Sequence, residues 1–213
     1  MEFVREDISE DEVVRRRAAI EPLTDTVRDL IDAVIRTEVG DDVLATAQQR
    51  IAAVVDDLRA RQIDGAFGVR YTPALTGMAW GNAVVGARNA IAPPLRTRRD
   101  GDAVVADFTL GAAYEGPPGH VHGGVCALIL DQMLGEGASV DDAPCFTGTI
   151  SVRYLRPTRL GELSARAAIA SREGRKRIVR GTIADADGVT CEAEGTFVIP
   201  RRFTSDGDPA SQG

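Results

Sequence analysis

The sequence predicts an α+β fold in which an antiparallel sheet wraps around one long central helix, with a helical extension at the N-terminus. Three observations predict it. A nearly continuous apolar run covers residues 123–138, which is typical of a buried helix. Segments rich in β-branched residues follow this run, whereas residues 9–62 carry apolar side chains at helical spacing. A buried helix between antiparallel strands is expected to fill the concave face of their sheet.

The N-terminal segment, residues 9–62, predicts amphipathic helices. Ser9 and Glu12 form a capping box that begins the first helix, and Pro22 is expected to separate this short helix from a second one. Gly40 is expected to end the second helix. The apolar stripes of the second and third helices are Leu23, Val27, Leu30, Ile31, Val34 and Ile35, and Leu44, Ala47, Ile51, Val54, Val55 and Leu58. Each stripe must be buried against something.

The composition changes after residue 62, where Gly, Pro and β-branched residues become more frequent. Asp100-Gly101 is typical of a tight turn between two strands, residues 95–99 and 102–110. After the helix we expect four strands, at residues 145–156, 160–172, 175–184 and 189–199. The domains expected are a helical extension over residues 1–64, a sheet-and-helix domain over 65–203 and a flexible tail over 204–213.

The composition excludes several classes of protein. With 44% apolar and 27% charged residues the chain has the balance of an ordinary globular protein, and its net charge of −7 argues against a general nucleic-acid role. The first residues lack a signal-peptide layout and no apolar run is long enough to span a bilayer, so we expect a cytoplasmic protein without a membrane partner. The three cysteines are expected to be reduced, packed thiols.

The most informative motif is His122-Gly123-Gly124, followed by a lone carboxylate at Asp131. The two glycines leave backbone N–H groups open to an electron-rich ligand, and an ionisable group in an apolar run is costly unless it is used or paired. Asp131 is seven residues from Gly124, so it lies on nearly the same helix face but about 10 Å further along the axis. One helix cannot aim both groups at one carbonyl. Two antiparallel copies related by a two-fold axis can.

Residues 88–199 resemble the hotdog-fold acyl-CoA thioesterase superfamily, in particular the branch related to the phenylacetate-pathway (PaaI-type) thioesterase. The resemblance rests on these segments and spacings: Asn89–Leu95, Tyr114–Gly119, His122-Gly123-Gly124, Asp131 nine positions after the histidine, Thr147 sixteen after the aspartate, and Tyr154–Pro157. It implies a hotdog fold, hydrolysis of acyl-CoA and perhaps acyl-carrier-protein thioesters, and active sites at a dimer interface. Residues 9–62 lie outside the usual hotdog unit.

The resemblance also implies roles for individual residues. The backbone N–H of Gly124, or that of Gly123, would bind the thioester oxygen at the positive end of the helix dipole. Asp131 from the partner subunit would act as general base or as nucleophile, two roles that the sequence leaves open. Thr147 would orient the water or the carboxylate.

Further roles are expected around this centre. His122 would position the turn or bond to the substrate carbonyl, and Asn89 would support substrate binding from the other side. Coenzyme A is expected as part of the substrate, with no separate cofactor, in a homodimer or a dimer of dimers. Since coenzyme A carries phosphates, we expect contacts from the basic group Arg172, Arg175, Lys176 and Arg177 around Gly174.

Alternatives remain open from the residues alone. Asp131 could be satisfied by a neighbouring hydroxyl, the glycines could serve only a tight turn, and the basic group could be a solvated hairpin tip. His120 and His122 could bind a metal with Cys126 or Asp131, but the spacing is unlike common zinc patterns and no metal is expected. Competing functions are a non-catalytic acyl-CoA or lipid-binding hotdog protein and a hotdog hydratase. The extension could pack, cap the acyl pocket or build a larger oligomer.

Overall fold

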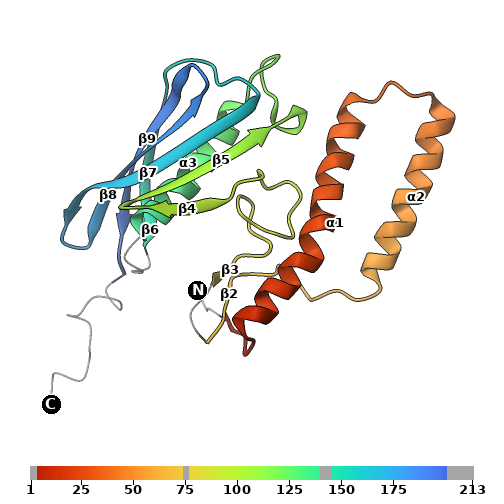
Figure 1. Cartoon of the computed structure of the whole chain (residues 1–213), viewed down its shortest axis with the longest axis horizontal. Helices are drawn as coiled ribbons and strands as arrows, with labels where there is room; N and C mark the ends of the chain where they lie inside the picture. The colour runs from red at the N-terminus through yellow and green to blue at the C-terminus, as the bar shows by residue number, and fades with distance from the viewer. Residues whose placement is uncertain (1–3, 74–76, 140–144, 201–213) are drawn as a thin grey trace. The chain divides into compact units, whose positions relative to one another are not determined.

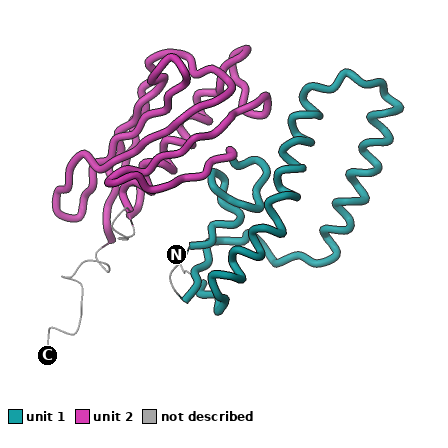
Figure 2. Tube along the Cα trace, in the orientation of Figure 1, with its two compact units in different colours: residues 1–92 teal, residues 93–213 magenta. Residues whose placement is uncertain are grey.

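The computed structural model describes residues 4–73, 77–139 and 145–200. The chain divides into two compact units, residues 1–92 and residues 93–213 (Figure 2). The domain boundary expected near residue 64 stays a prediction, and the expected flexible tail, residues 204–213, lies outside the described residues. Among the described residues no helix is long and apolar enough to cross a membrane.

The first unit contains two long helices, α1 (Glu10–Arg36) and α2 (Asp41–Arg59), and a small sheet. The Ser9 hydroxyl accepts a hydrogen bond from the Glu12 amide at 3.2 Å, which confirms the predicted helix start. The predicted break at Pro22 is wrong, because α1 continues through it. Pro22 removes the N–H that would bond to the Ala18 carbonyl, but Ala18 is exposed, so water can replace the lost donor.

Gly40 has a different role from the one predicted. The first helix already ends at Arg36, with Thr37 as its C-cap, and Gly40 is the N-cap of α2. Its carbonyl accepts hydrogen bonds from the amides of Val43 and Leu44 at 3.0 and 3.1 Å. Two aspartates in the first turn of α2 favour a helix start here through the helix dipole.

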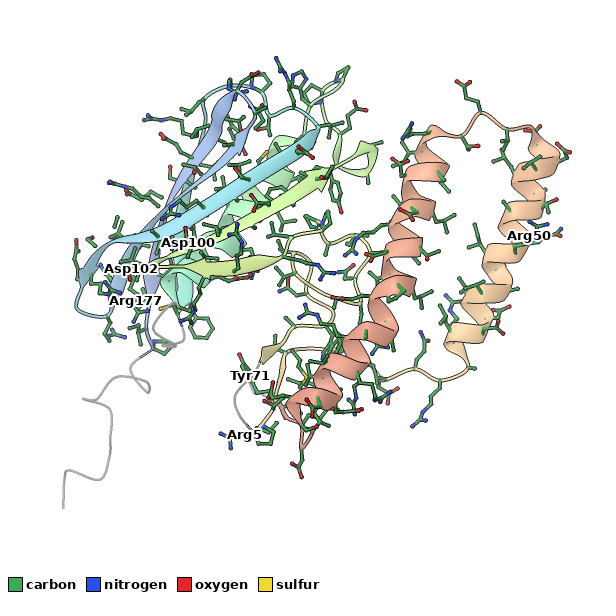
Figure 3. The ribbon with its side chains drawn as sticks, in the orientation of Figure 1. Arg5, Arg50, Tyr71, Asp100, Asp102 and Arg177 are labelled. Atoms are coloured by element: carbon green, nitrogen blue, oxygen red, sulfur yellow. The ribbon has the colours of Figure 1, made fainter. Side chains whose placement is uncertain are left out.

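The loop that ends the first unit, residues 79–92, is held against α1 by polar contacts. The Thr24 hydroxyl donates to the Ala87 carbonyl at 2.9 Å, and the Arg28 guanidinium donates to the carbonyls of Asn89 and Ala92 at 3.3 and 3.4 Å. The small sheet consists of β1 (Val4–Arg5), β2 (Arg70–Tyr71) and β3 (Gly77–Met78), in the order β1-β2-β3, with Arg5 paired to Tyr71 (Figure 3).

The second unit is a six-stranded antiparallel sheet with α3 (Gly123–Ala138) along one face (Figure 1). Its strand order is β4-β5-β7-β8-β9-β6. The strands are β4 (Thr97–Asp100), β5 (Ala103–Leu110), β6 (Phe146–Tyr154), β7 (Gly161–Glu173), β8 (Lys176–Asp185) and β9 (Gly188–Val198). Asp100 and Asp102 flank the tight turn at Gly101, which has a positive φ of 58° (Figure 3). The predicted hairpin, helix and four later strands are all found.

Burial of α3 is one-sided, which corrects the expectation of a helix buried all round. The face on the sheet is closely packed: a Cβ at Gly137 would lie 3.1 Å from a methyl carbon of Val179. On the other face Gly124, Leu128 and Asp131 are exposed. The reason is that a single sheet covers only one side of a helix. The buried residues are Cys126, Ile129, Leu130, Met133, Leu134, Gly137 and Ala138.

Candidate active site

The loop that leads into α3 is fixed by backbone hydrogen bonds. The His122 amide donates to the Tyr114 carbonyl and the Gly116 amide to the His120 carbonyl, both at 2.9 Å. The Val121 amide donates to the Thr158 carbonyl at 2.8 Å, which ties the loop to the segment before β7. Gly116 is required by close approach, because a Cβ there would lie 2.7 Å from the His122 Cα. The start of α3 therefore has a defined position.

His122 is the N-cap of α3. Its Nδ1 accepts a hydrogen bond from the Gly124 amide at 3.0 Å. An acceptor nitrogen must be unprotonated, so in the neutral ring the proton lies on Nε2. The Gly124 N–H predicted as oxyanion donor is thus engaged by His122 in this structure. The neighbouring Gly123 N–H donates no hydrogen bond within the described part of the chain.

Tyr154, at the end of β6, anchors the same helix start. Its hydroxyl donates to the Gly123 carbonyl at 2.8 Å, and its ring would contact a Cβ at Gly123 at 3.4 Å. Burial raises the pKa of the Tyr154 hydroxyl, which favours the protonated, donating form. Sequence reasoning identifies Tyr154 only as part of a motif, because nothing in its spacing indicates a contact with Gly123, 31 positions earlier.

Asp131 and Thr147 come together as expected. The Thr147 hydroxyl donates to Asp131 Oδ1 at 3.3 Å, and both residues are exposed on the uncovered side of α3. The pairing of β6 with β9 shifts between Thr147 and Thr149, so a bulge at Gly148 lies directly beside this contact. Bulges redirect the side chains next to them, which accounts for the position of Thr147 at the helix. A hydroxyl donor at this distance orients the carboxylate.

The two parts of the predicted site are far apart within one chain. Asp131 lies seven residues after Gly124 on the straight helix α3, a rise of about 10 Å. The structure thus brings Thr147 to Asp131, and His122 to Gly124, but it does not bring the two pairs together. A reacting carbonyl at the start of α3 is beyond reach of the carboxylate of the same chain.

The predicted basic group is split by the structure. Arg175 and Lys176 are exposed at the β7–β8 turn, whereas Arg177 is buried, with 5% of its surface exposed, and donates to the Ala138 carbonyl at the end of α3 (Figure 3). A guanidinium at a helix C-terminus stabilises the negative end of the dipole, so Arg177 is a structural cap and not a phosphate ligand. Arg172 is exposed and is the second-last residue of β7.

The remaining basic residues lie at the same end of the sheet as Thr147. Lys176 pairs with Val198 on β9, and Val198 pairs with Phe146, the residue before Thr147. Two strand spacings separate Lys176 from Phe146, about 10 Å. The turn that carries Arg175 and Lys176 is therefore near the Asp131–Thr147 pair rather than near the start of α3.

Comparison with known proteins identifies the family. A family model of the thioesterase superfamily matches residues 118–192. The crystal structure of a thioesterase-superfamily protein matches 84% of this chain and 90% of its own, with 33% identity and a TM-score of 0.75. This chain belongs to the thioesterase superfamily. The predictions of the family and of the hotdog fold are confirmed.

Two curated proteins are also similar to this chain. Acyl-coenzyme A thioesterase THEM4 of Mus musculus is 32% identical over 96 residues, and that of Xenopus laevis is 32% identical over 97 residues. Each match covers 45% of this chain, and 41% and 44% of the two relatives. The chain thus spans less than half of the length of these relatives.

Asn89, predicted to support substrate binding in this thioesterase-superfamily chain, lies in the first unit. Its amide nitrogen donates to the carbonyls of Gly81 and Asn82 at 3.3 and 3.2 Å, and its amide oxygen accepts from the Ile91 N–H at 3.2 Å. These bonds brace the loop over residues 81–91. A contact of Asn89 with substrate stays a prediction.

The buried thiol of Cys126 in this superfamily member is a poor candidate for catalysis. A hydrogen bond with Cys191 and burial raise the pKa of the Cys126 thiol, so Cys126 is not a nucleophile. Thr158 and Thr190 complete this buried group, with their hydroxyls 2.7 Å apart. No cluster of three or more His, Cys, Asp or Glu residues in the described ranges fits a metal ion.

Proposed function

We propose that this chain hydrolyses acyl-CoA thioesters to the free acid and the thiol, and that acyl-carrier-protein thioesters are a second substrate class. The observation that carries the proposal is the Asp131–Thr147 contact of 3.3 Å on the exposed face of α3. A carboxylate oriented by a hydroxyl, with open space beside it, is what the activation of water or direct attack on a carbonyl requires. The similarity to proteins named acyl-coenzyme A thioesterase supports the same chemistry.

The active site of the proposal is shared by two copies. The start of α3 in one copy binds the thioester carbonyl, and Asp131 of the partner subunit attacks it or activates water. Two observations support a partner on this side. The exposed face of α3 carries Leu128, and β6 is a nine-residue edge strand with mostly exposed residues. Exposed edge strands and apolar patches are typical protein interfaces.

The oxyanion donor of the proposal is the Gly123 N–H, which needs no rearrangement to bind a carbonyl oxygen. The Gly124 N–H joins it when the His122 ring turns away from it. The positive end of the α3 dipole stabilises charge on that oxygen. Whether through water directly or through an acyl-Asp131 intermediate, the C–S bond breaks, water supplies the new carboxylate oxygen, and the thiolate leaves and takes up a proton. Both roles of Asp131 remain in the proposal.

The nucleotide part of coenzyme A is assigned to the exposed basic turn. Arg175 donates to the Ile199 carbonyl at 3.1 Å, which holds its guanidinium at the sheet end where Asp131 and Thr147 lie. Arg172 and Lys176 flank it on the paired strands. We also propose that the protein is located in the cytoplasm, as expected from the sequence.

A thiol-release assay tests the proposal. A panel of acyl-CoAs and one acyl-pantetheine, which lacks the nucleotide, is assayed with the wild type and with Asp131→Asn. We expect Asp131→Asn to lower kcat by about 10³-fold, because the amide can neither attack nor accept a proton. For the wild type, KM should be higher for the acyl-pantetheine than for the acyl-CoAs, with little difference in kcat.

The matched control is Asp107→Asn, an exposed aspartate of β5 whose only described ion pair is with Arg98 at 2.8 Å. It should retain wild-type turnover. Near-normal turnover of folded Asp131→Asn would refute the assignment of the carboxylate.

A second candidate function, non-catalytic binding of acyl-CoA, is favoured by one observation: the Gly124 N–H is already bonded to His122 at 3.0 Å. Binding of acyl-CoA without thiol release across the panel would select this candidate.

A further inference from the structure

Helix α2 is an amphipathic helix without a packing partner in the described residues. None of its residues is buried, and it packs closely on no other helix or strand described. Val54 and Leu58 are 50% and 51% exposed. Most of the stability of a protein helix comes from packing of its apolar face, so the apolar stripe of this 19-residue helix stabilises it only when it is covered.

The apolar residues of both helices follow a heptad pattern. Successive members of each series are separated by alternating steps of three and four residues, the spacing of a coiled-coil interface. The series are Ile20, Leu23, Val27, Leu30 and Val34 in α1, and Leu44, Ala47, Ile51, Val54 and Leu58 in α2. We call them the α1 seam and the α2 seam.

The two seams do not close on one another. Figure 1 shows α1 and α2 as an antiparallel hairpin, and between the helices an apolar groove remains open. Residues of both helices line this groove: Val34, Leu44, Ala47, Gln48, Ile51 and Ala52. A helical hairpin with an open apolar seam is half of a four-helix bundle.

We propose that the α1–α2 hairpin of a second copy of this chain covers the seams, forming an antiparallel four-helix bundle about a two-fold axis. A two-fold interface joins the same patch on both subunits, so it requires a self-complementary surface. The α2 seam and Val34, the exposed end of the α1 seam, supply the apolar part of that surface. The charges beside the α2 seam supply the rest.

The charge pattern specifies an antiparallel pairing of α2 with its copy. When Val54 packs against Ile51 of the partner subunit, the heptad places Arg50 opposite Asp57 of the partner subunit, and the two-fold axis repeats this ion pair. Within the described residues neither Arg50 nor Asp57 makes an ion pair, and Arg50 projects outward from α2 (Figure 3).

This interface differs from the one in the proposed active site. The bundle uses residues of α1 and α2, whereas the shared active site uses α3 and β6. Two different two-fold interfaces on one chain give a closed dimer of dimers when their axes meet at right angles. The bundle does not depend on the proposed hydrolase activity, because none of its residues is assigned to catalysis.

Sedimentation equilibrium of the full chain tests the bundle. Val54→Asp places a carboxylate in the α2 seam. We expect it to raise the dissociation constant of the four-helix bundle more than about 100-fold, so that the molar mass of the assembly falls by half. Ala53→Asp, one residue away and outside the seam, has a larger helix-propensity cost than Val54→Asp and should still leave the mass unchanged. Circular dichroism checks that both variants stay folded. A wild-type mass that Val54→Asp does not lower would overturn the proposal, whether the second unit, a lipid or another protein covers α2 instead.

Charge reversal tests the register. Arg50→Asp and Asp57→Arg each replace two attractive pairs by two repulsive ones, so each should raise the dissociation constant about tenfold. The double variant restores the pairs with reversed sign and should return within about twofold of the wild type. Single reversals without effect, or a double variant as weak as the singles, would overturn the antiparallel arrangement.

Discussion

The side chain of His122 has two effects at one point of the molecule. It caps α3 by accepting the Gly124 N–H at 3.0 Å, and by doing so it competes with any ligand for that N–H. The sequence could predict that this residue type mattered at a helix start, because His122 precedes two glycines. It could not predict the cap, because the cap depends on the orientation of the His122 ring and on the loop conformation, in which the His122 amide donates to the Tyr114 carbonyl. The same holds for Tyr154, whose partner is distant in sequence.

Substitution of His122 should separate its capping role from any role in turnover. Asparagine is among the best N-cap residues and alanine among the poorest. We expect His122→Ala to lower the free energy of unfolding by about 1 kcal/mol and His122→Asn to restore most of it. Urea denaturation at pH 7.5 measures both values. An alanine variant as stable as the wild type would mean that the Nδ1 contact contributes nothing to the helix start.

At the scale of elements, the sequence predicts the helices and strands whose bounds depend mainly on residues close to them in the chain. The bounds of α3 agree with prediction because a run of apolar residues with a histidine-glycine start leaves few alternatives. The predictions for Pro22 and Gly40 are wrong for two reasons. The effect of Pro22 depends on whether the carbonyl four residues earlier faces solvent, and the role of Gly40 depends on where the first helix ends. The exposure of one α3 face was missed because it depends on how many layers cover the helix.

One inter-element ion pair carries a stability that varies with pH. Arg156, just after β6, donates to both carboxylate oxygens of Asp185 at the end of β8, at 2.8 and 2.5 Å. Its hydrogen bonds hold the pKa of Asp185 well below the ordinary value of 3.8. Because the folded pKa is depressed, the stabilisation is fully present above about pH 4 and is lost as the pH falls toward the folded value.

Removal of this arginine should therefore cost stability in a pH-dependent way. The Asp185 side chain is only 6% exposed, so Arg156→Ala leaves an unpaired, nearly buried carboxylate and should cost about 3 kcal/mol at pH 7. The difference from the wild type should shrink below pH 4. Arg153→Ala, which breaks the exposed pair with Glu192 at 3.4 Å, should change stability by less than about 0.5 kcal/mol. Denaturant titrations at pH 7 and pH 3 compare the two. A constant difference for Arg156→Ala would contradict the role of Asp185 ionisation.

At the scale of the whole molecule, the proposed reaction needs two chains, because the start of α3 and Asp131 are about 10 Å apart along one helix. Gly123→Pro removes the proposed oxyanion donor with little strain, because proline suits the first position of a helix and His122 already has an extended backbone with ψ of 131°. We expect this variant to lose about 10²–10³ in kcat. Asp131→Asn should also lose turnover, because it removes the carboxylate at the other end of the proposed site.

Mixed assemblies of these two variants decide whether the site is shared. If Asp131 acts on the partner subunit, a hybrid dimer of Asp131→Asn with Gly123→Pro contains one intact site and one doubly damaged site. Random pairing of co-expressed subunits should then restore about a quarter of wild-type activity. If each chain used its own Asp131, every site would carry one lesion and no activity would return. Co-expression of Asp131→Asn with the double variant Gly123→Pro/Asp131→Asn is the control, since no combination of these subunits contains an intact Asp131. Recovery in the first mixture but not in the control would establish that one copy supplies the carbonyl site and the other the carboxylate.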